Sequence, residues 1–170
     1  MKNLTQIILV SHDNEANNHI QNNIRQSGIL VNIKIALNGG HALLYLNHLQ
    51  LCNKTNDGII LVLLNMDTPV VDGVKFLTEY KQTRNLQKEN ICIMVLDDNL
   101  NEDKKHKALS LGVSHFLSSP CCPIQLKSNI NDFRFSSEQE AEPALVTMPL
   151  KINTKALKSN YLLRQRYNYK

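Results

Sequence analysis

The stretch IILVLLNMDTPVVDG, residues 59–73, carries the strongest fold signal in the chain. Ile59–Leu64 is an unbroken apolar run of strand length, which is typical of a parallel strand buried on both faces of a sheet. Asn65 follows it directly, and a turn signal and a helix start come next. Parallel sheets bind ligands where their strands end at the carboxyl side, so Asn65 stands where chemistry is expected. A carboxamide, however, is neither charged nor nucleophilic.

The pattern of a strand followed by a helix recurs along the chain. The sequence predicts strands over Gln6–Val10, Ile29–Ala36, Ile59–Leu64, Ile91–Leu96 and Ser114–Leu117. It predicts helices between Asp13 and Gly28, over His41–Leu51 after a turn at residues 38–40, around Val74–Tyr80, over Asp103–Leu111 and over Pro123–Phe133. Five β–α repeats imply a parallel sheet with helices on both faces. This order fits a doubly wound, flavodoxin-like (βα)5 α/β fold with strand order 2-1-3-4-5 and a C-terminal extension.

Several leucines and one isoleucine are candidates for the core. Spacing in the second predicted helix favours a buried face made of Leu43, Leu44, Leu46 and Leu49. Later in the chain, the core or interface candidates are Leu100, Leu109, Leu117 and Ile124, and core is the commoner place for such residues. The four histidines His41, His48, His106 and His115 are expected on solvated faces.

Length and charge divide the chain into a domain and an extension. With 170 residues, one domain of residues 1–135 and a modest extension is the default. Residues 1–135 carry 13 Lys/Arg and 12 Asp/Glu, so this part is nearly neutral. Residues 136–149 carry three Glu and no base, which indicates an acidic linker, and residues 150–170 carry six Lys/Arg and no acid. This basic tail is expected to be either helical or disordered.

Cysteine usage and hydropathy favour a cytoplasmic protein. The four cysteines, Cys52, Cys92, Cys121 and Cys122, form no C-x-x-C pair and no zinc-type spacing, so we expect reduced thiols. The N-terminus leads straight into a strand and shows no signal peptide. No apolar run approaches the length of a membrane span.

Three segments together resemble the receiver domain of bacterial two-component response regulators. They are IILVSHDN at residues 7–14, the opening stretch with its P-x-x-D-G at Pro69–Gly73, and LGVSHFLSSP at residues 111–120. The resemblance covers roughly residues 5–133. It implies the flavodoxin-like fold described above and a role in signal transduction.

The resemblance also implies a role for each position of the site. Such receivers carry a phosphoacceptor aspartate after the third strand, where this chain has Asn65. An acidic pair that holds Mg²⁺ corresponds to Ser11 and His12. The Thr/Ser position after the fourth strand is Asp97, and the lysine position after the fifth strand is Ser119. Phe116 aligns with the aromatic residue that couples the pocket to the surface of the fourth helix, fifth strand and fifth helix, although ordinary packing explains it equally well.

The sequence departs from the receiver pattern at all five of those phosphorylation-site positions. Phosphoryl transfer needs an in-line nucleophile and a metal that neutralises the transferring group. An amide nitrogen is nearly non-nucleophilic, and a serine with an imidazole is a poor substitute for two Mg²⁺-binding carboxylates. We therefore expect a domain that does not depend on phosphorylation, with weak or absent Mg²⁺ binding and no other cofactor.

The altered site leaves other roles open. His12 and Asp97 could form a charge-assisted hydrogen bond, and with Asp13 and Asp67 they are weak candidates for a metal site. A rim of polar groups that hydrogen-bond to one another is the more common outcome. Asp67 as a substitute phosphoacceptor is disfavoured because it lies two residues too far along. Asn65 itself could simply hydrogen-bond the following loop.

The sequence thus favours a receiver-like signalling module that is no enzyme and acts by protein–protein interaction. The expected partner is a histidine kinase or another signalling protein, docked on the surface of the fourth helix, fifth strand and fifth helix, and a homodimer is left open. Rival hypotheses are a working phosphoacceptor and a small-molecule or metal binder at the strand ends, although SHDN has no G-x-G phosphate loop. A nucleic-acid binder that uses the basic tail is a further alternative. No membrane partner is expected.

Overall fold

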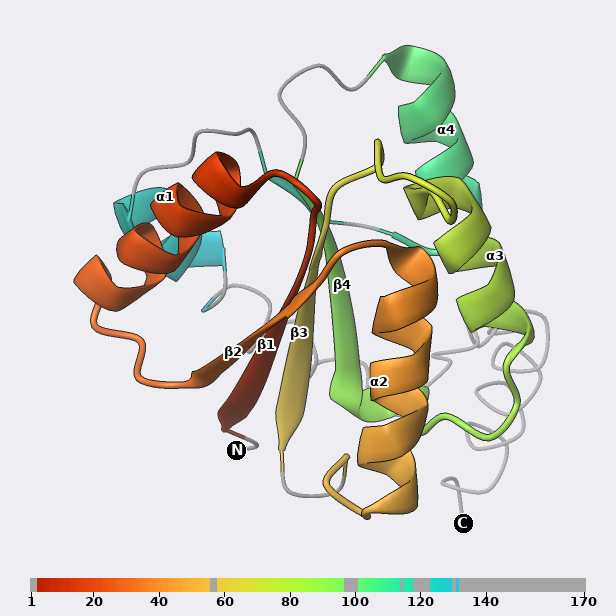
Figure 1. Ribbon diagram of the computed structural model, residues 1–170, viewed down its shortest axis with the longest axis horizontal. Helices are drawn as coiled ribbons and strands as arrows, with labels where there is room; N and C mark the ends of the chain where they lie inside the picture. The colour runs from red at the N-terminus through yellow and green to blue at the C-terminus, as the bar shows by residue number, and fades with distance from the viewer. Residues whose placement is uncertain are drawn as a thin grey trace, which may run out of the picture. The chain divides into compact units, whose positions relative to one another are not determined.

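The computed structural model of the chain describes residues 3–55, 58–96, 101–113, 115–117, 123–129 and 131 (Figure 1). Contacts divide the chain into two units, Met1–Gln139 and Glu140–Lys170, and every described residue belongs to the first. The predicted linker, residues 136–149, and the predicted tail, residues 150–170, lie outside the described residues and stay predictions.

Five parallel strands form one sheet. They are β1 (Leu4–Val10), β2 (Asn32–Ala36), β3 (Ile59–Leu64), β4 (Ile91–Leu96) and β5 (His115–Leu117). Their order across the sheet is β2-β1-β3-β4-β5, and each neighbouring pair is parallel. The predicted flavodoxin-like fold and its strand order are therefore confirmed.

Helices cover both faces of this sheet. They are α1 (Asn14–Gln26), α2 (Gly39–Leu51), α3 (Gly73–Gln82) and α4 (Glu102–Ser110), and residues 123–129 are also helical. A short 3₁₀ turn, η1 (Lys88–Asn90), leads into β4. In Figure 1, α2 and α3 lie on the opposite side of the sheet from α1. None of the described helices is long and apolar enough to cross a membrane.

Alternation along the strands builds two apolar cores. Ile8 and Val10 of β1 pack with α2, α3 and Ala108 of α4 on one face, whereas Ile7 and Leu9 pack with α1 on the other. All six residues of β3 are buried, because odd and even positions serve opposite cores. This explains why the opening stretch is apolar without interruption.

Several predicted boundaries were wrong. β1 begins two residues before Gln6, because Leu4 already pairs with Ile59. β2 begins at Asn32 and not at Ile29, since its pairing with β1 starts at Gln6 opposite Asn32. α4 runs from Glu102 to Ser110, one residue earlier at each end than predicted, because the Asn101 side chain caps it.

The predicted turn at residues 38–40 is in fact the start of α2. The Asn38 Oδ1 atom accepts a 3.0 Å hydrogen bond from the His41 backbone N–H and so caps the helix. Gly39 and Gly40 form its first turn. A Cβ atom on Gly39 would lie 2.6 Å from Phe76 Cβ, so the close approach of α2 to α3 requires a glycine.

The core prediction for Leu44 was wrong. For Leu109 and Ile124, predicted in the core or at an interface, the core alternative was wrong and the interface stays a prediction. Leu44 is 70% exposed, because the buried side of α2 is formed by Ala42, Leu43, Leu46 and Leu49. Leu109 and Ile124 are 46% and 81% exposed, since Ala108 and Leu126 take the inward positions of their helices. Leu117 is buried as predicted, and Leu100 lies outside the described residues. His41, His48 and His106 are exposed as expected, whereas His115 is half-buried.

Candidate functional site

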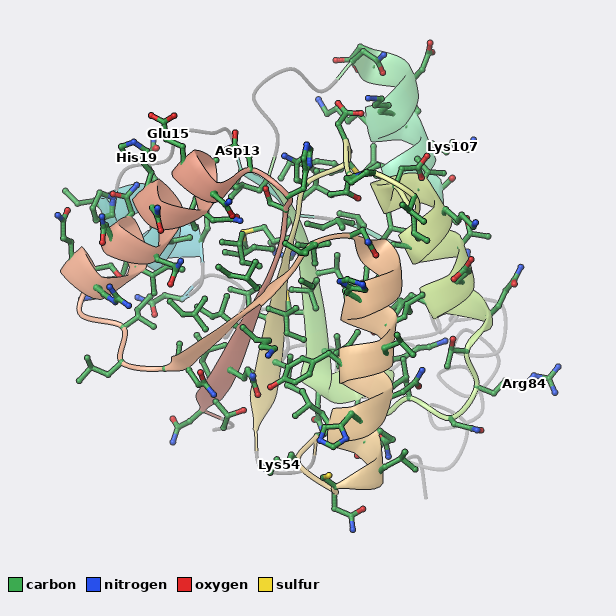
Figure 2. The ribbon with its side chains drawn as sticks, in the orientation of Figure 1. Asp13, Glu15, His19, Lys54, Arg84 and Lys107 are labelled. Carbon is green, nitrogen blue, oxygen red and sulfur yellow. The ribbon has the colours of Figure 1, made fainter. Side chains whose placement is uncertain are left out.

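The ends of β1 and β3 bring the first candidate residues together. Val10 and Leu64 are paired at the last position of their strands, and the Asn65 N–H donates to the Val10 carbonyl at 3.0 Å. The Ser11 N–H donates to the Ala36 carbonyl at the end of β2, also at 3.0 Å. Ser11 and Asn65 therefore leave the sheet at the same edge. Figure 2 shows Asp13 at this edge and Lys54 at the opposite one.

The Asn65 side chain forms a hydrogen bond within its own loop. Its Oδ1 atom accepts a 2.8 Å hydrogen bond from the backbone N–H of Asp67, two residues on. This is the local Asx turn that asparagine and aspartate favour. The prediction that Asn65 hydrogen-bonds the following loop is confirmed. The side chain is half-buried, and its acceptor oxygen holds the β3–α3 loop in shape.

The residues after β1 are likewise engaged locally. Ser11 is 2% exposed, its Oγ atom accepts from the Asp13 N–H at 3.2 Å, and its carbonyl accepts from Asn17 Nδ2 at 3.2 Å. Asp13 caps α1 as predicted, since its Oδ1 accepts from the N–H groups of Glu15 and Ala16. His12 is exposed. The Ser11 Oγ and the Asp13 Oδ1 atoms thus both accept hydrogen bonds from the local backbone.

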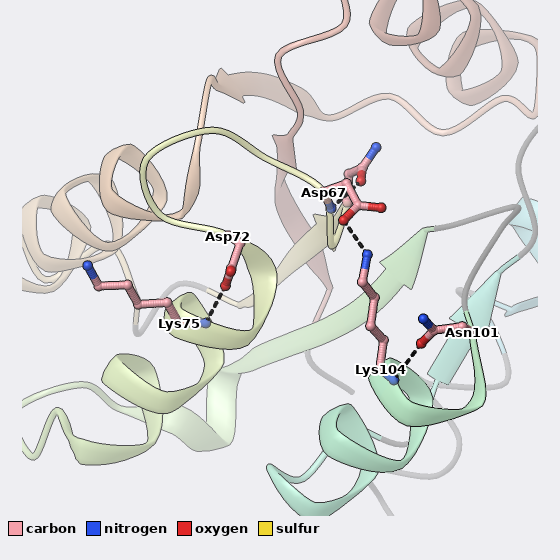
Figure 3. A network of polar contacts seen from close by, with 6 residues as sticks. Asp67, Asp72, Lys75, Asn101 and Lys104 are labelled. Carbon is pink, nitrogen blue, oxygen red and sulfur yellow. Dashed lines mark hydrogen bonds and ion pairs between the residues drawn. The ribbon is translucent and has the colours of Figure 1, made fainter.

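Asp67 is exposed and forms an ion pair with Lys104 of α4 (Figure 3). The same view shows the two helix caps around it, with the Asn101 side chain on the Lys104 N–H and the Asp72 side chain on the Lys75 N–H. Sequence reasoning missed Lys104, because 37 residues separate it from Asp67 and no local pattern links them. An ammonium group thus lies beside the β3–α3 loop although it comes from α4.

Three side-chain oxygens at this edge accept hydrogen bonds from the backbone. They are the Ser11 Oγ, the Asp13 Oδ1 and the Asn65 Oδ1 atoms, whereas Mg²⁺ prefers carboxylate and other hard oxygen ligands in octahedral geometry. Within the described ranges, no three His, Cys, Asp or Glu side chains gather as a metal site would require. Asp97 and Ser119 lie outside the described residues, so the possible hydrogen bond between His12 and Asp97 stays untested.

Phe116 lies in β5 on the side of the sheet that α2, α3 and α4 cover. It is half-buried and packs against the core on that face. Packing therefore accounts for it. Its proposed coupling to the strand-end site stays a prediction.

Solved structures of receiver domains share this fold. This chain matches a CheY-like receiver domain from Methanospirillum hungatei JF-1 with 17% identity and a TM-score of 0.61. The match covers 81% of this chain and 99% of that domain. The phosphorylated cyanobacterial phytochrome response regulator RcpA matches over 82% of this chain and 98% of its own, with 22% identity and a TM-score of 0.60. The bacteriophytochrome response regulator AtBRR matches over 76% of this chain and 92% of its own, with 24% identity and a TM-score of 0.60.

No protein-family model matches the sequence, and no curated protein matches it significantly. The likeness therefore rests on the arrangement of strands and helices and not on sequence identity. On that arrangement, the chain has the CheY-like fold of response-regulator receiver domains.

Proposed function

We propose that this chain is a receiver-like signalling module that acts by protein–protein contact and accepts no phosphoryl group. One observation carries the proposal. The residue directly after β3 is a carboxamide, and its Oδ1 atom already accepts the Asp67 N–H. An amide at this place supplies no in-line nucleophile, and its oxygen is engaged in the turn.

The surroundings of Asn65 support the same proposal. Ser11 is buried and hydrogen-bonded, so the end of β1 presents no pair of free carboxylates. Asp67, the nearest alternative carboxylate along the chain, is paired with Lys104. Without a metal-binding acidic pair, charge on a transferring phosphoryl group would not be neutralised. We therefore propose that the module signals without catalysing a reaction of its own.

The partner proposed for this module is a histidine kinase or another signalling protein. The surface of α4, β5 and residues 123–129 is the proposed contact, as in receiver domains generally. The exposed side chains of Leu109 in α4 and Ile124 in residues 123–129 support this proposed contact. Exposed large apolar side chains favour a protein contact.

Titration with Mg²⁺ and then beryllofluoride, followed by amide NMR, tests the loss of phosphoryl binding. We expect no saturable shifts at Ser11, Asn65 or Asp67 in the full chain. The Asn65→Asp variant should behave in the same way, because the acidic pair is still missing. The triple variant Ser11→Asp, His12→Asp, Asn65→Asp is the comparison, because it introduces a carboxylate at each of these three positions. Saturable shifts in the unmodified chain, or a phosphoryl adduct in its intact mass after treatment with acetyl phosphate, would refute the proposal.

A further inference from the structure

A groove of about 450 Å³ lies between β2 and the outer side of α2. Residues from β2 and the position after it line it together with α2, including Lys34, Leu37, His41, Leu44, Tyr45 and His48. β2 is at one edge of the sheet and β5 at the other. The groove is therefore separate from the surface of α4 and β5, and an inference about it does not rest on the proposed function.

The outer side of α2 carries a regular stripe. His41, Leu44, His48 and Leu51 follow one another at intervals of three, four and three residues, which places them along one side of the helix. Leu44 and Leu51 are both largely exposed, although the opposite side of α2 is already buried. The two apolar members, Leu44 and Leu51, are seven residues apart, which is the repeat of equivalent positions in a seam where one helix packs against another. The stripe is thus suited to receive a second helix.

The segment that builds the groove carries formal charge of a single sign. Between Glu15 and Asp57 the sequence contains no acidic residue, and this segment includes all of β2 and α2. Lys34, His41 and His48 are exposed and line the groove. A surface that combines apolar residues with Lys34, in a segment without acidic residues, is complementary to an apolar stripe flanked by carboxylates.

The aromatic side chain in the groove is held in place before any partner arrives. Gln6 Nε2 donates a 2.6 Å hydrogen bond to Tyr45 Oη, which ties the ring to β1. The Lys34 ammonium lies 5.5 Å from the centroid of the same ring. A side chain that is already ordered loses little conformational freedom on binding.

From these observations we infer that the groove between β2 and α2 binds an acidic amphipathic helix of a partner protein. The apolar side of that helix packs between Leu37 and Leu44 and along Leu51, and its carboxylates contact Lys34, His41 and His48. A second copy of this chain fits less well, because it would bring Lys34 and the same imidazoles to the contact. Addition of a strand at the edge of β2 is disfavoured by the exposed Lys34.

The inference can be tested by amide NMR with the full chain and a synthetic helical peptide. The probe has leucine at the seam positions of each heptad and glutamate at the flanking positions. A comparison peptide has lysine in place of every glutamate. We expect saturable shifts in residues 34–52 with the acidic peptide, weaker at high salt, and no such shifts with the basic peptide. Equal shifts with both peptides, or no shifts in residues 34–52, would overturn the inference.

Two exposed leucines provide a matched pair of variants. Leu44→Glu removes an apolar contact and repels the probe, so it should weaken binding by at least about tenfold. Leu30→Glu makes the same change in the loop before β2, outside the groove lining, and should leave the affinity unchanged. Both side chains are exposed, so neither substitution should disturb the fold. Equal affinities for the two variants would contradict the inference, as would concentration-dependent shifts of residues 34–52 without peptide, which would identify a second copy as the occupant.

Discussion

Lys104, in the first turn of α4, forms an ion pair with Asp67, in the loop after β3. The pair ties α4 to the edge of the sheet where Asn65 lies. α4 is also held by Ala108, the one buried residue among its nine described residues, and by a 3.3 Å hydrogen bond from Lys81 Nζ to the Ser110 carbonyl. At least one of the contacts that position α4 is therefore not encoded by sequence periodicity.

Breaking this pair should loosen α4 without unfolding the domain. In Asp67→Asn we expect faster amide hydrogen exchange in Glu102–Ser110. Because both side chains are partly exposed and water screens them, the loss of global stability should stay below about 1 kcal/mol. Glu102→Gln, which removes the looser 3.8 Å pair with Lys105 within α4, is the control and should change exchange less. Equal exchange in both variants would show that the Asp67 contact does not anchor the helix.

A strained valine marks the β3–α3 loop. Val70 has a φ of 68°, a conformation costly for a β-branched residue, and the Val71 N–H donates to the Pro69 carbonyl at 2.7 Å across it. Val70 is 88% exposed, so its side chain contributes little burial. Val70→Gly should stabilise the protein by up to about 1 kcal/mol in urea unfolding, because glycine adopts this φ freely. Val70→Ala keeps a Cβ atom and should gain less, and a destabilised Val70→Gly variant would disprove the strain.

Gly39 should tolerate no side chain. A Cβ atom there would lie 2.6 Å from Phe76 Cβ and 2.9 Å from Val71 Cγ1. We expect Gly39→Ala to destabilise the protein by roughly 1–3 kcal/mol in urea unfolding, since α2 and α3 must separate. In Gly40→Ala the nearest atom is the Asn38 Oδ1 at 3.2 Å, and alanine favours the helix, so this variant should be close to neutral. Equal stability of the two variants would contradict the close packing.

The two described cysteines should differ in reactivity. Cys52 is exposed and Cys92 is buried in β4, both as free thiols. Burial raises the pKa of the Cys92 thiol, so little thiolate forms there. With iodoacetamide near pH 8, peptide mapping should find Cys52 modified in the folded protein and Cys92 modified only after unfolding. Rapid modification of Cys92 under native conditions would refute its placement in the core.

Alkaline pH should lower the stability of the folded domain. Burial raises the pKa of Tyr80, with smaller contributions from Cys92 and Glu89, and burial also raises that of Cys92. In the unfolded chain these groups lose protons above about pH 8.5 for the thiol and about pH 10 for the phenol. The folded protein holds its protons to higher pH, so the free energy of unfolding should fall as pH rises through this range.

Two variants provide the comparison for that pH dependence. Tyr80→Phe and Cys92→Ala each remove one of the two groups, so each should show a shallower fall in the free energy of unfolding than the parent chain. Urea unfolding between about pH 8 and pH 11 measures this free energy, because the range spans the ordinary pKa values of the thiol and the phenol. Parallel curves for the parent and both variants would show that other groups cause the alkaline loss.

Local patterns in the sequence were sufficient for the element order and the parallel sheet, and the strand order followed from the fold that this element order fits. Apolar runs such as Ile59–Leu64 and helix caps such as Asp13 depend on neighbours a few residues away, and these are visible in the sequence itself. The same holds for Asn65, whose hydrogen bond reaches a residue only two positions on. The turn at the candidate site was therefore predictable.

Tertiary structure alone decided the features that join distant segments. The pair between Asp67 and Lys104, the contact that excludes a side chain at Gly39, and the exposure of Leu44 all depend on how helices settle on the sheet. Several helix faces contain enough leucine to be buried, and only the final packing selects which one is. Periodicity fixes which residues share a side of a helix, whereas long-range packing and charge determine which side turns inward and which side chains meet.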